Sequence, residues 1–267
     1  MKSAKKIYMV LLFAFLYLPI FVMIFSSFND SKSRTIFAGF TLRWYEELFQ
    51  NEVVLKSLAT TLVIALVSSV IATLLGTFAA VGIHRMKKLP QKIILNISYM
   101  PVLNPEIITG VSLLLLFAVA KNFAGSWVFG WPSLLIAHIT FNVPYIILSV
   151  LPKLRQMDER LYEAALDLGC NEKQAFFKVV LPEISPGIIS GFLIAITYSI
   201  DDFVISYFTS GTLQTLPIVI FSMTRKKVSP EINALSTIMF VAVLAILLLI
   251  NFKDTRDQKK LNLKQEI

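Results

Sequence analysis

The sequence predicts an all-α membrane protein with six transmembrane helices, on the evidence of composition, apolar run length and charge placement. The chain has 267 residues, of which 56% are hydrophobic and 16% are charged. Soluble domains average about 45–50% apolar and about 25% charged residues. Six apolar runs reach the roughly 20 residues that cross a bilayer, and all 25 Lys and Arg residues lie outside them. This composition excludes a soluble enzyme, a disordered regulator and a disulfide-stapled secreted domain.

The expected spans follow one another at residues 7–28, 57–83, 93–120, 131–151, 186–208 and 232–250. Helices are favoured because each lipid-embedded segment must satisfy its own backbone groups, and the spans do not alternate as barrel strands do. The first run has 22 residues, against about 7–15 for the apolar part of a signal peptide. We therefore interpret it as an uncleaved helix. In the third span, Pro101 and Pro105 interrupt the helix.

The distribution of basic residues predicts the orientation of the chain. With the N-terminus inside, the inner segments carry 17 basic residues and the outer segments carry 8. Because Lys and Arg concentrate on the cytoplasmic side, both termini are predicted to be cytoplasmic. The net charge of +8 is then explained by the orientation of the chain in the membrane and does not indicate nucleic-acid binding. The single cysteine, Cys170, cannot form an intramolecular disulfide and is expected to stay reduced in the cytosol.

Three acids, Glu106, Asp201 and Asp202, are the only charged residues within the six spans. A buried acid costs at least a few kcal/mol and usually faces a cavity or a partner. Because no Lys or Arg lies in any span, the unbalanced sign suggests a pathway for cations. The alternative for Glu106 is a protonated side chain beside a proline kink. Adjacent helical residues point about 100° apart, so one Asp is expected to meet substrate while the other bonds to a neighbouring helix.

The outer loop between the first two spans contains the string TLRWYEELF, with Trp44 and Tyr45. An aromatic face can hold an ammonium group by a cation–π attraction of about 0.5–2 kcal/mol. The alternative is an interfacial anchor, which this segment alone favours.

The cytoplasmic loop 152–185 is predicted to form two short helices around a glycine turn. Asp158 is a plausible N-cap for the first helix, which Gly169 ends, and Asn171 is a plausible N-cap for the second, which Pro182 is expected to stop. Apolar residues recur on the first helix at helical spacing: Leu161, Ala164, Ala165 and Leu168. The apolar face either docks on a partner or packs against the ends of the membrane helices. A DNA-binding helix-turn-helix is disfavoured because the loop holds six acids and five bases.

The same loop carries a family signature. Glu163-Ala164-Ala165, then Gly169 after three intervening residues, and Val179 and Leu181-Pro182 beyond it resemble the EAA loop of ABC importer permeases, with Val where Ile is usual. The resemblance implies a single permease domain over 1–267 with the type I ABC importer fold, placed in the bacterial inner membrane. It implies that Glu163, Ala164, Ala165, Gly169 and Glu172 couple to an ATPase. The chain has no GxxxxGK[ST] phosphate loop, so ATP and Mg are expected on that partner. We expect no catalytic residue, cofactor or metal in this chain.

A narrower resemblance runs over essentially the whole chain. The ordered strings LYLPI, TLRWYEELF, MPVLNPEIITGVSLLLLF, LIAHITFNVPY, YSIDDFVISYF and VSPEINALSTI are similar to the smaller permease of the Pot family of spermidine/putrescine importers. This resemblance implies that Trp44, Glu106 and Asp201 lie on the polyamine path, although relatives have Asp where this chain has Glu106. It implies a PotB-like second permease, a PotA-like ATPase dimer and a PotD-like binding protein.

Three rival functions stay open from the sequence. One is an ABC permease for another solute, such as thiamine, ferric ion or an anion, although three acids without a base disfavour an anion. A second is an ion-coupled secondary transporter, which leaves the EAA loop unexplained. A third is an intramembrane aspartyl enzyme, which needs two acids that share a proton. Asp201 and Asp202 diverge on a helix, and Glu106 could face one of them, but no protease motif supports this function.

Overall fold

A computed structural model of the chain describes residues 2–31, 36–125, 128–226, 230–241 and 244. Within these ranges every regular element is a helix, and β pairing is limited to one isolated antiparallel bridge between Asn29 and Phe40. The all-α class is therefore confirmed. The chain forms two compact units, Met1–Leu55 with Ile220–Ile267, and Lys56–Val219, and each is described by itself.

The first unit contains α1 (Lys2–Ser27), α2 (Arg43–Gln50) and a helical stretch at 230–241. Helix α1 is apolar on all sides from Ile7 onward, as expected for a helix surrounded by lipid. The Asn29–Phe40 bridge closes the loop that leads into α2, and the Phe28 and Phe40 rings stack across it.

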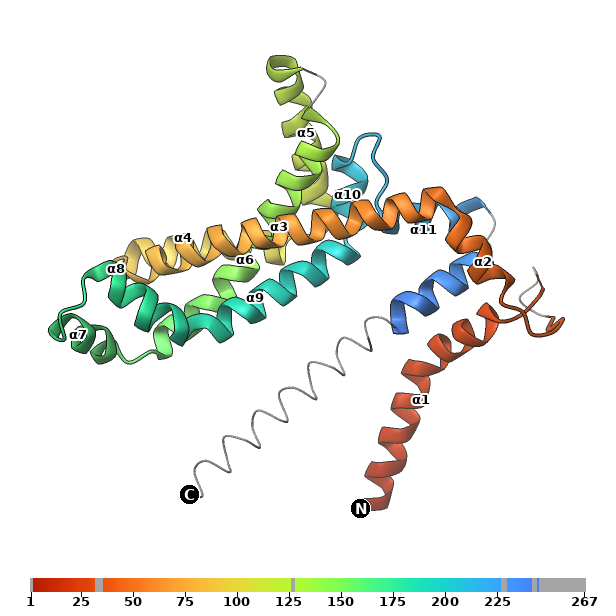
Figure 1. Ribbon diagram of the computed structural model, residues 1–267, viewed down its shortest axis with the longest axis horizontal. Coiled ribbons are helices and arrows are strands. Elements are labelled where there is room, and N and C mark those ends of the chain that lie inside the picture. Colours follow the sequence, from red (N-terminus) through yellow and green to blue (C-terminus); the bar gives the residue numbers. More distant parts are fainter. Residues whose placement is uncertain (1, 32–35, 126–127, 227–229, 242–243, 245–267) are drawn as a thin grey trace. The chain divides into compact units, whose positions relative to one another are not determined.

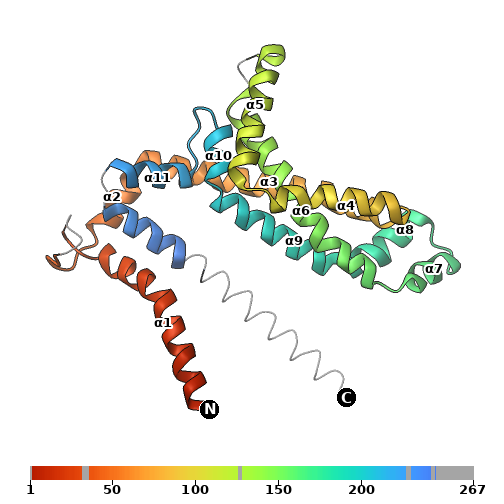
Figure 2. The same cartoon turned by 180° about the vertical axis from the view of Figure 1, so that it is seen from behind.

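The second unit takes up most of α3 (Glu52–His84) and runs to the start of α11 (Leu216–Lys226). Between them come α4 (Lys88–Leu103), α5 (Glu106–Ala124), α6 (Trp131–Gln156), α7 (Glu159–Asp167), α8 (Glu172–Ala175), the π-helical turn η2 (Phe176–Val180), α9 (Leu181–Asp201) and α10 (Val204–Thr209). Helices α6 and α9 pack along their lengths, with α7 and α8 at one end of the pair and α10 at the other (Figures 1 and 2).

Five of the described helices are long and apolar enough to cross a membrane: Lys5–Ser27, Glu52–His84, Glu106–Phe123, Trp131–Gln156 and Glu172–Asp201. Each of these helices covers all or the larger part of one of the first five predicted spans. The predicted sixth span, 232–250, extends beyond the described residues, and its described part is helical to 241.

The predicted span 93–120 is not one helix, because the chain breaks between α4 and α5. Asn104 has an extended backbone (φ −75°, ψ 143°) and precedes Pro105. A residue before proline is pushed out of the helical region because the proline ring clashes with its backbone. Pro101, which was expected to contribute to the interruption, lies inside α4 without ending it.

The predicted span 186–208 also needs correction. Helix α9 starts earlier and ends at Asp201, and the extended residue Asp202 (ψ 115°) separates it from α10. Asp201 and Asp202 therefore do not lie on one continuous helix. Pro182 does not stop the second loop helix either, because the helix continues through it. Leu181 N–H bonds to the Phe176 carbonyl five residues back, and this wider π turn carries the helix past the proline.

The core of the second unit lies where α3, α6 and α9 meet. Its completely buried side chains include Ala72 and Ala80 of α3, Ile146 and Val150 of α6, and Ile184 of α9. Small residues allow this close packing. A Cβ on Gly187 of α9 would lie 2.8 Å from the Ser149 carbonyl oxygen, so only glycine fits at this crossing.

Candidate functional site

Residues at or next to both helix breaks of the second unit line one cavity of about 170 Å³. Glu106, which is the first residue of α5 and follows the Asn104–Pro105 break, lines this cavity. Asp201, the last residue of α9, and Asp202, in the second break, line it from α9 and its extension. The fold therefore brings together the three acids that the sequence singled out, although Glu106 is far from the other two along the chain.

The cavity wall is otherwise apolar and aromatic. Its other lining residues are Pro101, Thr109, Phe141, Tyr145, Tyr198, Phe203, Val204 and Ile205. The rings of Tyr145 on α6 and Tyr198 on α9 stack with centroids 4.7 Å apart and an interplanar angle of 27°. Tyr198 keeps 44% of its surface exposed. No Lys or Arg belongs to this lining, so the described wall carries acidic charge against aromatic faces.

The three acids differ in what they contact. Glu106 and Asp201 are exposed, whereas the Asp202 side chain is only 5% exposed. Asp202 Oδ2 accepts hydrogen bonds from Ser206 N and Ser206 Oγ, both at 2.7 Å, and Oδ1 accepts one from Ile205 N at 3.2 Å. Asp202 thus caps the first turn of α10, where backbone N–H groups lack helical partners. Asp201 and Glu106 are left facing the cavity.

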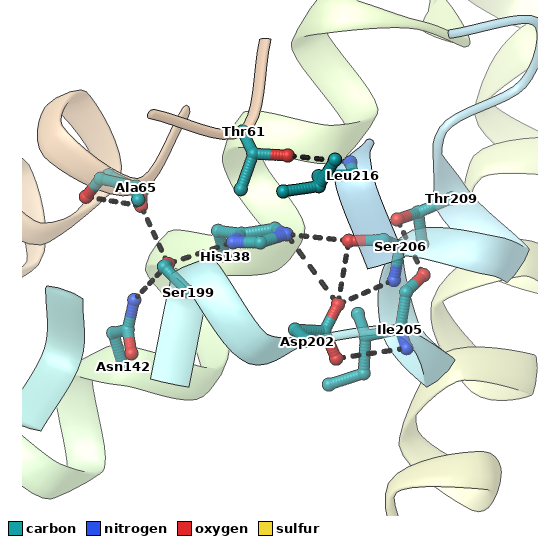
Figure 3. Close-up of polar contacts among 11 residues, drawn as sticks. Thr61, Ala65, His138, Asn142, Ser199, Asp202, Ile205, Ser206, Thr209 and Leu216 are labelled. Atoms are coloured by element: carbon teal, nitrogen blue, oxygen red, sulfur yellow. Dashed lines mark hydrogen bonds and ion pairs between the residues drawn. The ribbon is translucent and has the colours of Figure 1, made fainter. Parts of the chain in front are cut away.

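A buried histidine that the sequence analysis did not single out stands behind Asp202 (Figure 3). His138 of α6 places Nε2 3.0 Å from Ser206 Oγ and 3.6 Å from Asp202 Oδ2, and Nδ1 2.8 Å from Ser199 Oγ. One signal was available, because His138 is the only histidine inside a predicted span. A polar ring at that depth is expected to have a partner. Tyr145 and Tyr198 were also missed, because aromatic residues are frequent along the whole chain.

The cytoplasmic loop has the two predicted helices and caps. Asp158 accepts a hydrogen bond from Arg160 N, and Asn171 accepts one from Gln174 N. Gly169 has φ +89°, a left-handed conformation that favours glycine. The apolar surface of the loop is partly uncovered, since Leu168 is 86% exposed and Leu161 and Phe177 are also exposed.

The predicted coupling residues divide between surface and interior. Glu163, Ala164, Gly169 and Glu172 are exposed, whereas Ala165 is buried. Glu163 and Glu172 line one pocket of about 430 Å³ with Arg85, the residue that follows α3. The structure therefore brings the two glutamates together at the end of the α6–α9 pair.

A profile of the binding-protein-dependent transport system inner membrane components matches residues 72–254 of the chain. The chain belongs to this family. This inner membrane component is 36% identical to the spermidine/putrescine transport system permease protein PotC of Haemophilus influenzae, over 92% of this chain and 94% of that protein. It is 39% identical to the putrescine transport system permease protein PotI of Escherichia coli K12, over 91% of this chain and 88% of that protein.

Solved structures of other transporters share the fold of this chain. A chain of a bacterial ABC transporter that imports the acidic polysaccharide alginate superposes with a TM-score of 0.72, over 95% of this chain and 94% of that chain, at 19% identity. An amino acid ABC transporter chain superposes with a TM-score of 0.51 over 78% of this chain and 98% of that chain. The ABC importer permease fold is therefore confirmed.

Trp44, for which the family resemblance implies a place on the substrate path, lies in the first unit. Its ring is only 2% exposed, Nε1 donates to the Asn29 carbonyl at 2.8 Å, and the Arg43 guanidinium lies 4.3 Å from the ring centroid. Both its hydrogen-bonding group and a ring face are thus engaged within the loop. Contact between Trp44 and substrate stays a prediction.

Proposed function

We propose that the chain is the permease subunit of an ATP-driven importer of polyamines such as spermidine and putrescine. The two relatives reported above are permeases of spermidine/putrescine and putrescine transport systems. The observation that supports the substrate class most directly is the cavity lined by Glu106, Asp201 and Asp202 without a basic residue. Carboxylates in a span attract cations and disfavour anions.

The cavity chemistry suits a protonated amine on an aliphatic chain. The exposed carboxylates of Glu106 and Asp201 would each contact an ammonium group, and charge-assisted bonds of this kind are the stronger ones. The exposed face of Tyr198 would attract the same charge by a cation–π contact. The contacts are transient, because a transport site must release its cargo. A role of Trp44 on this path would be exerted through the shape of the outer loop that holds its buried ring.

The remaining parts of the importer are proposed as separate chains. A PotB-like permease would complete the pathway, a PotD-like protein would deliver substrate from outside, and a PotA-like ATPase dimer would bind ATP and Mg. Both termini of this chain would be cytoplasmic, and it would perform no covalent chemistry. Closure of the ATPase would move the loop that carries Glu163 and Gly169. The long helix Glu172–Asp201 would transmit this movement to the cavity as a rigid element.

The test is ATP-driven uptake of labelled spermidine and putrescine into proteoliposomes that contain the complete complex. Native complex is compared with Asp201→Asn and Glu106→Gln, and ATPase activity is measured in the same preparations. Both substitutions remove charge at nearly constant size. Glu46→Gln on α2 is the matched control, because Glu46 is an exposed acid that does not line the cavity.

Uptake lost in both cavity variants, with ATPase activity retained, is the expected result. Full uptake in both variants would overturn the acid-lined pathway. Absence of polyamine uptake by the native complex would overturn the substrate class, and other cationic solutes would then be tested. Uptake that needs no ATPase would overturn the importer class itself.

A further inference from the structure

His138 is the most completely buried ionisable group in the described cavity region, and the transport scheme above does not use it. Its side chain is 1% exposed and lies in the first third of α6, between α9 and α10 (Figure 3). An apolar residue would pack at this position without requiring any hydrogen bond. A buried polar group that is left unpaired is costly, so the partners of His138 show what its placement requires.

The hydrogen-bond directions on the Asp202 side follow from the donor count. Ser206 Oγ donates its single hydrogen to Asp202 Oδ2 at 2.7 Å. Ser206 Oγ can therefore only accept from His138 Nε2, 3.0 Å away, which means that Nε2 carries a hydrogen. The same N–H lies 3.6 Å from Asp202 Oδ2. Both contacts hold the α10 cap against α6.

The other ring nitrogen completes a network over four helices. With hydrogen on Nε2, the neutral ring accepts at Nδ1 from Ser199 Oγ at 2.8 Å. Ser199 of α9 accepts from Asn142 Nδ2 of α6 at 3.0 Å, and it lies 3.1 Å from Ser68 Oγ of α3. The network therefore joins α3, α6, α9 and α10. Its centre is a ring that contacts the residues on both sides of the α9–α10 break.

The position of the break determines where Asp201 lies. Asp201 ends α9 and Asp202 is the next residue, so Asp202 fixes the backbone from which the Asp201 carboxylate extends. Two residues before Asp201, Ser199 holds α9 through its hydrogen bond to the opposite side of the His138 ring. In enzymes, a misplacement of about 1 Å can lower the rate about a hundredfold, and we expect a carboxylate that contacts a transported cation to depend on its position in the same way.

We propose that His138 is a positioning residue for transport, which acts through Ser206 and Asp202 to hold the α9–α10 break and thereby the Asp201 carboxylate at the cavity. This inference rests on the proposed function for its effect on uptake. Its structural part, the placement of residue 201, does not depend on the identity of the substrate. The two parts are therefore tested by separate measurements.

The chain offers a matched pair of substitutions at His138 itself. His138→Gln places an amide N–H group near the position of Nε2 and keeps a donor toward Ser206 and Asp202. His138→Asn places its amide near the position of Nδ1 and reaches only Ser199. Both side chains are polar, but asparagine is one methylene group smaller, so Ser206→Ala, which leaves residue 138 unchanged, separates loss of the Nε2 contact from loss of volume. A second pair comes from α3, where Ser68→Ala removes a network member and Ser69→Ala removes a neighbouring buried hydroxyl that has no partner among the described residues.

The first measurement is the rate at which a membrane-impermeant cationic methanethiosulfonate labels Asp201→Cys in the assembled complex. The background carries Cys170→Ser, since Cys170 is the only native cysteine, and this background serves as its own reference. We expect His138→Asn to change the labelling rate by about fivefold or more and His138→Gln by less than about twofold. Equal rates in the two variants would overturn the positioning role.

The second measurement is polyamine uptake per ATP hydrolysed, with Asp201 and Cys170 native. We expect a loss of about tenfold in His138→Asn and recovery to within about twofold of native in His138→Gln. Ser68→Ala should lower the ratio and Ser69→Ala should not.

If both His138 variants assemble poorly, Ser206→Ala replaces them and should reproduce the effects of His138→Asn in both measurements. A native ratio in Ser206→Ala would overturn the proposal. A native complex that imports no polyamine would overturn the proposed function, and the labelling comparison would still decide the positioning role.

Discussion

The carboxylates of Asp201 and Asp202 serve different parts of the structure, although the two residues are neighbours. That of Asp202 accepts hydrogen bonds from Ser206 and Ile205 at the start of α10, whereas that of Asp201 is exposed at the cavity. The pair therefore combines a structural acid with an acid that is available to a cation. The residue pattern predicted such a division without assigning the roles, and the family resemblance implied that Asp201 is the acid on the path.

Asp202→Ala is expected to destabilise the protein, and Asp201→Ala is not. Loss of a helix cap costs about 0.5–2 kcal/mol, and the substitution also leaves Ser206 without its acceptor. The melting temperature of the purified complex should therefore fall for Asp202→Ala and stay near native for Asp201→Ala. Equal melting temperatures for the two variants would contradict the assigned roles.

Tyr198→Leu should lower polyamine uptake per ATP, whereas Tyr198→Phe should keep it. Phenylalanine retains the aromatic face toward the cavity, and leucine removes it. A cation–π contact of about 0.5–2 kcal/mol corresponds to a loss of about two- to thirtyfold. Uptake at saturating, substrate-loaded binding protein is the appropriate measurement, because external affinity then does not limit the rate.

The control for Tyr198 is Tyr207→Leu on α10. Tyr207 is 53% exposed but does not line the cavity. Similar losses at the two positions would mean that a general effect of removing an exposed tyrosine, and not the cavity contact, explains the result.

Local signals predicted much of the fold. The loop caps at Asp158 and Asn171, the turn at Gly169 and a break near Pro105 depend on residues adjacent in the chain, and the structure confirms each of them. The apolar runs predicted six spans in the same way, and five of them coincide wholly or in part with long apolar helices among the described residues. The extent of the spans was less certain, because a proline such as Pro101 or Pro182 can lie inside a helix when the surrounding backbone accommodates it.

The features that the sequence did not predict depend on contacts between distant residues. The break at Asp202 has no proline or glycine to signal it and comes from side-chain bonds to backbone groups that compete with the helix. His138 bonds Ser199 and Ser206, which lie on other helices. Only the packing of α6 against α9 brings these residues together.

Leu168→Ser should weaken binding of the ATPase without changing the stability of the permease. Leu168 is 86% exposed at the end of α7, beside Gly169 in the signature loop. Burial of a leucine at an interface contributes about 1.5–3 kcal/mol, which corresponds to at least about a tenfold rise in the Kd of the ATPase. Copurification and titration of the ATPase with the detergent-solubilised permease would measure this effect.

Leu168→Met is the matched control, because methionine keeps the apolar area. It should bind the ATPase with nearly native affinity. Normal ATPase binding by Leu168→Ser would show that this side chain lies outside the coupling surface.

Gly187→Ala should separate α9 from α6 and lower the stability of the protein. Its Cβ would lie 2.8 Å from the Ser149 carbonyl oxygen and 3.3 Å from the Val150 Cα atom, and backbone atoms cannot move away as a side chain can. Overpacking of this kind costs about 1–3 kcal/mol.

Gly82→Ala on α3 is the matched control, because nothing lies within 4 Å of the Cβ position there. Alanine is favoured over glycine in a helix by about 1 kcal/mol, so the melting temperature should rise or stay unchanged for Gly82→Ala and fall for Gly187→Ala. Helices α6 and α9 connect the cytoplasmic loop 152–185 to the cavity, so Gly187→Ala should also lower uptake per ATP. A Gly187→Ala complex that is stable but does not couple ATP hydrolysis to uptake would show that the contact between the two helices transmits movement more than it stabilises the fold.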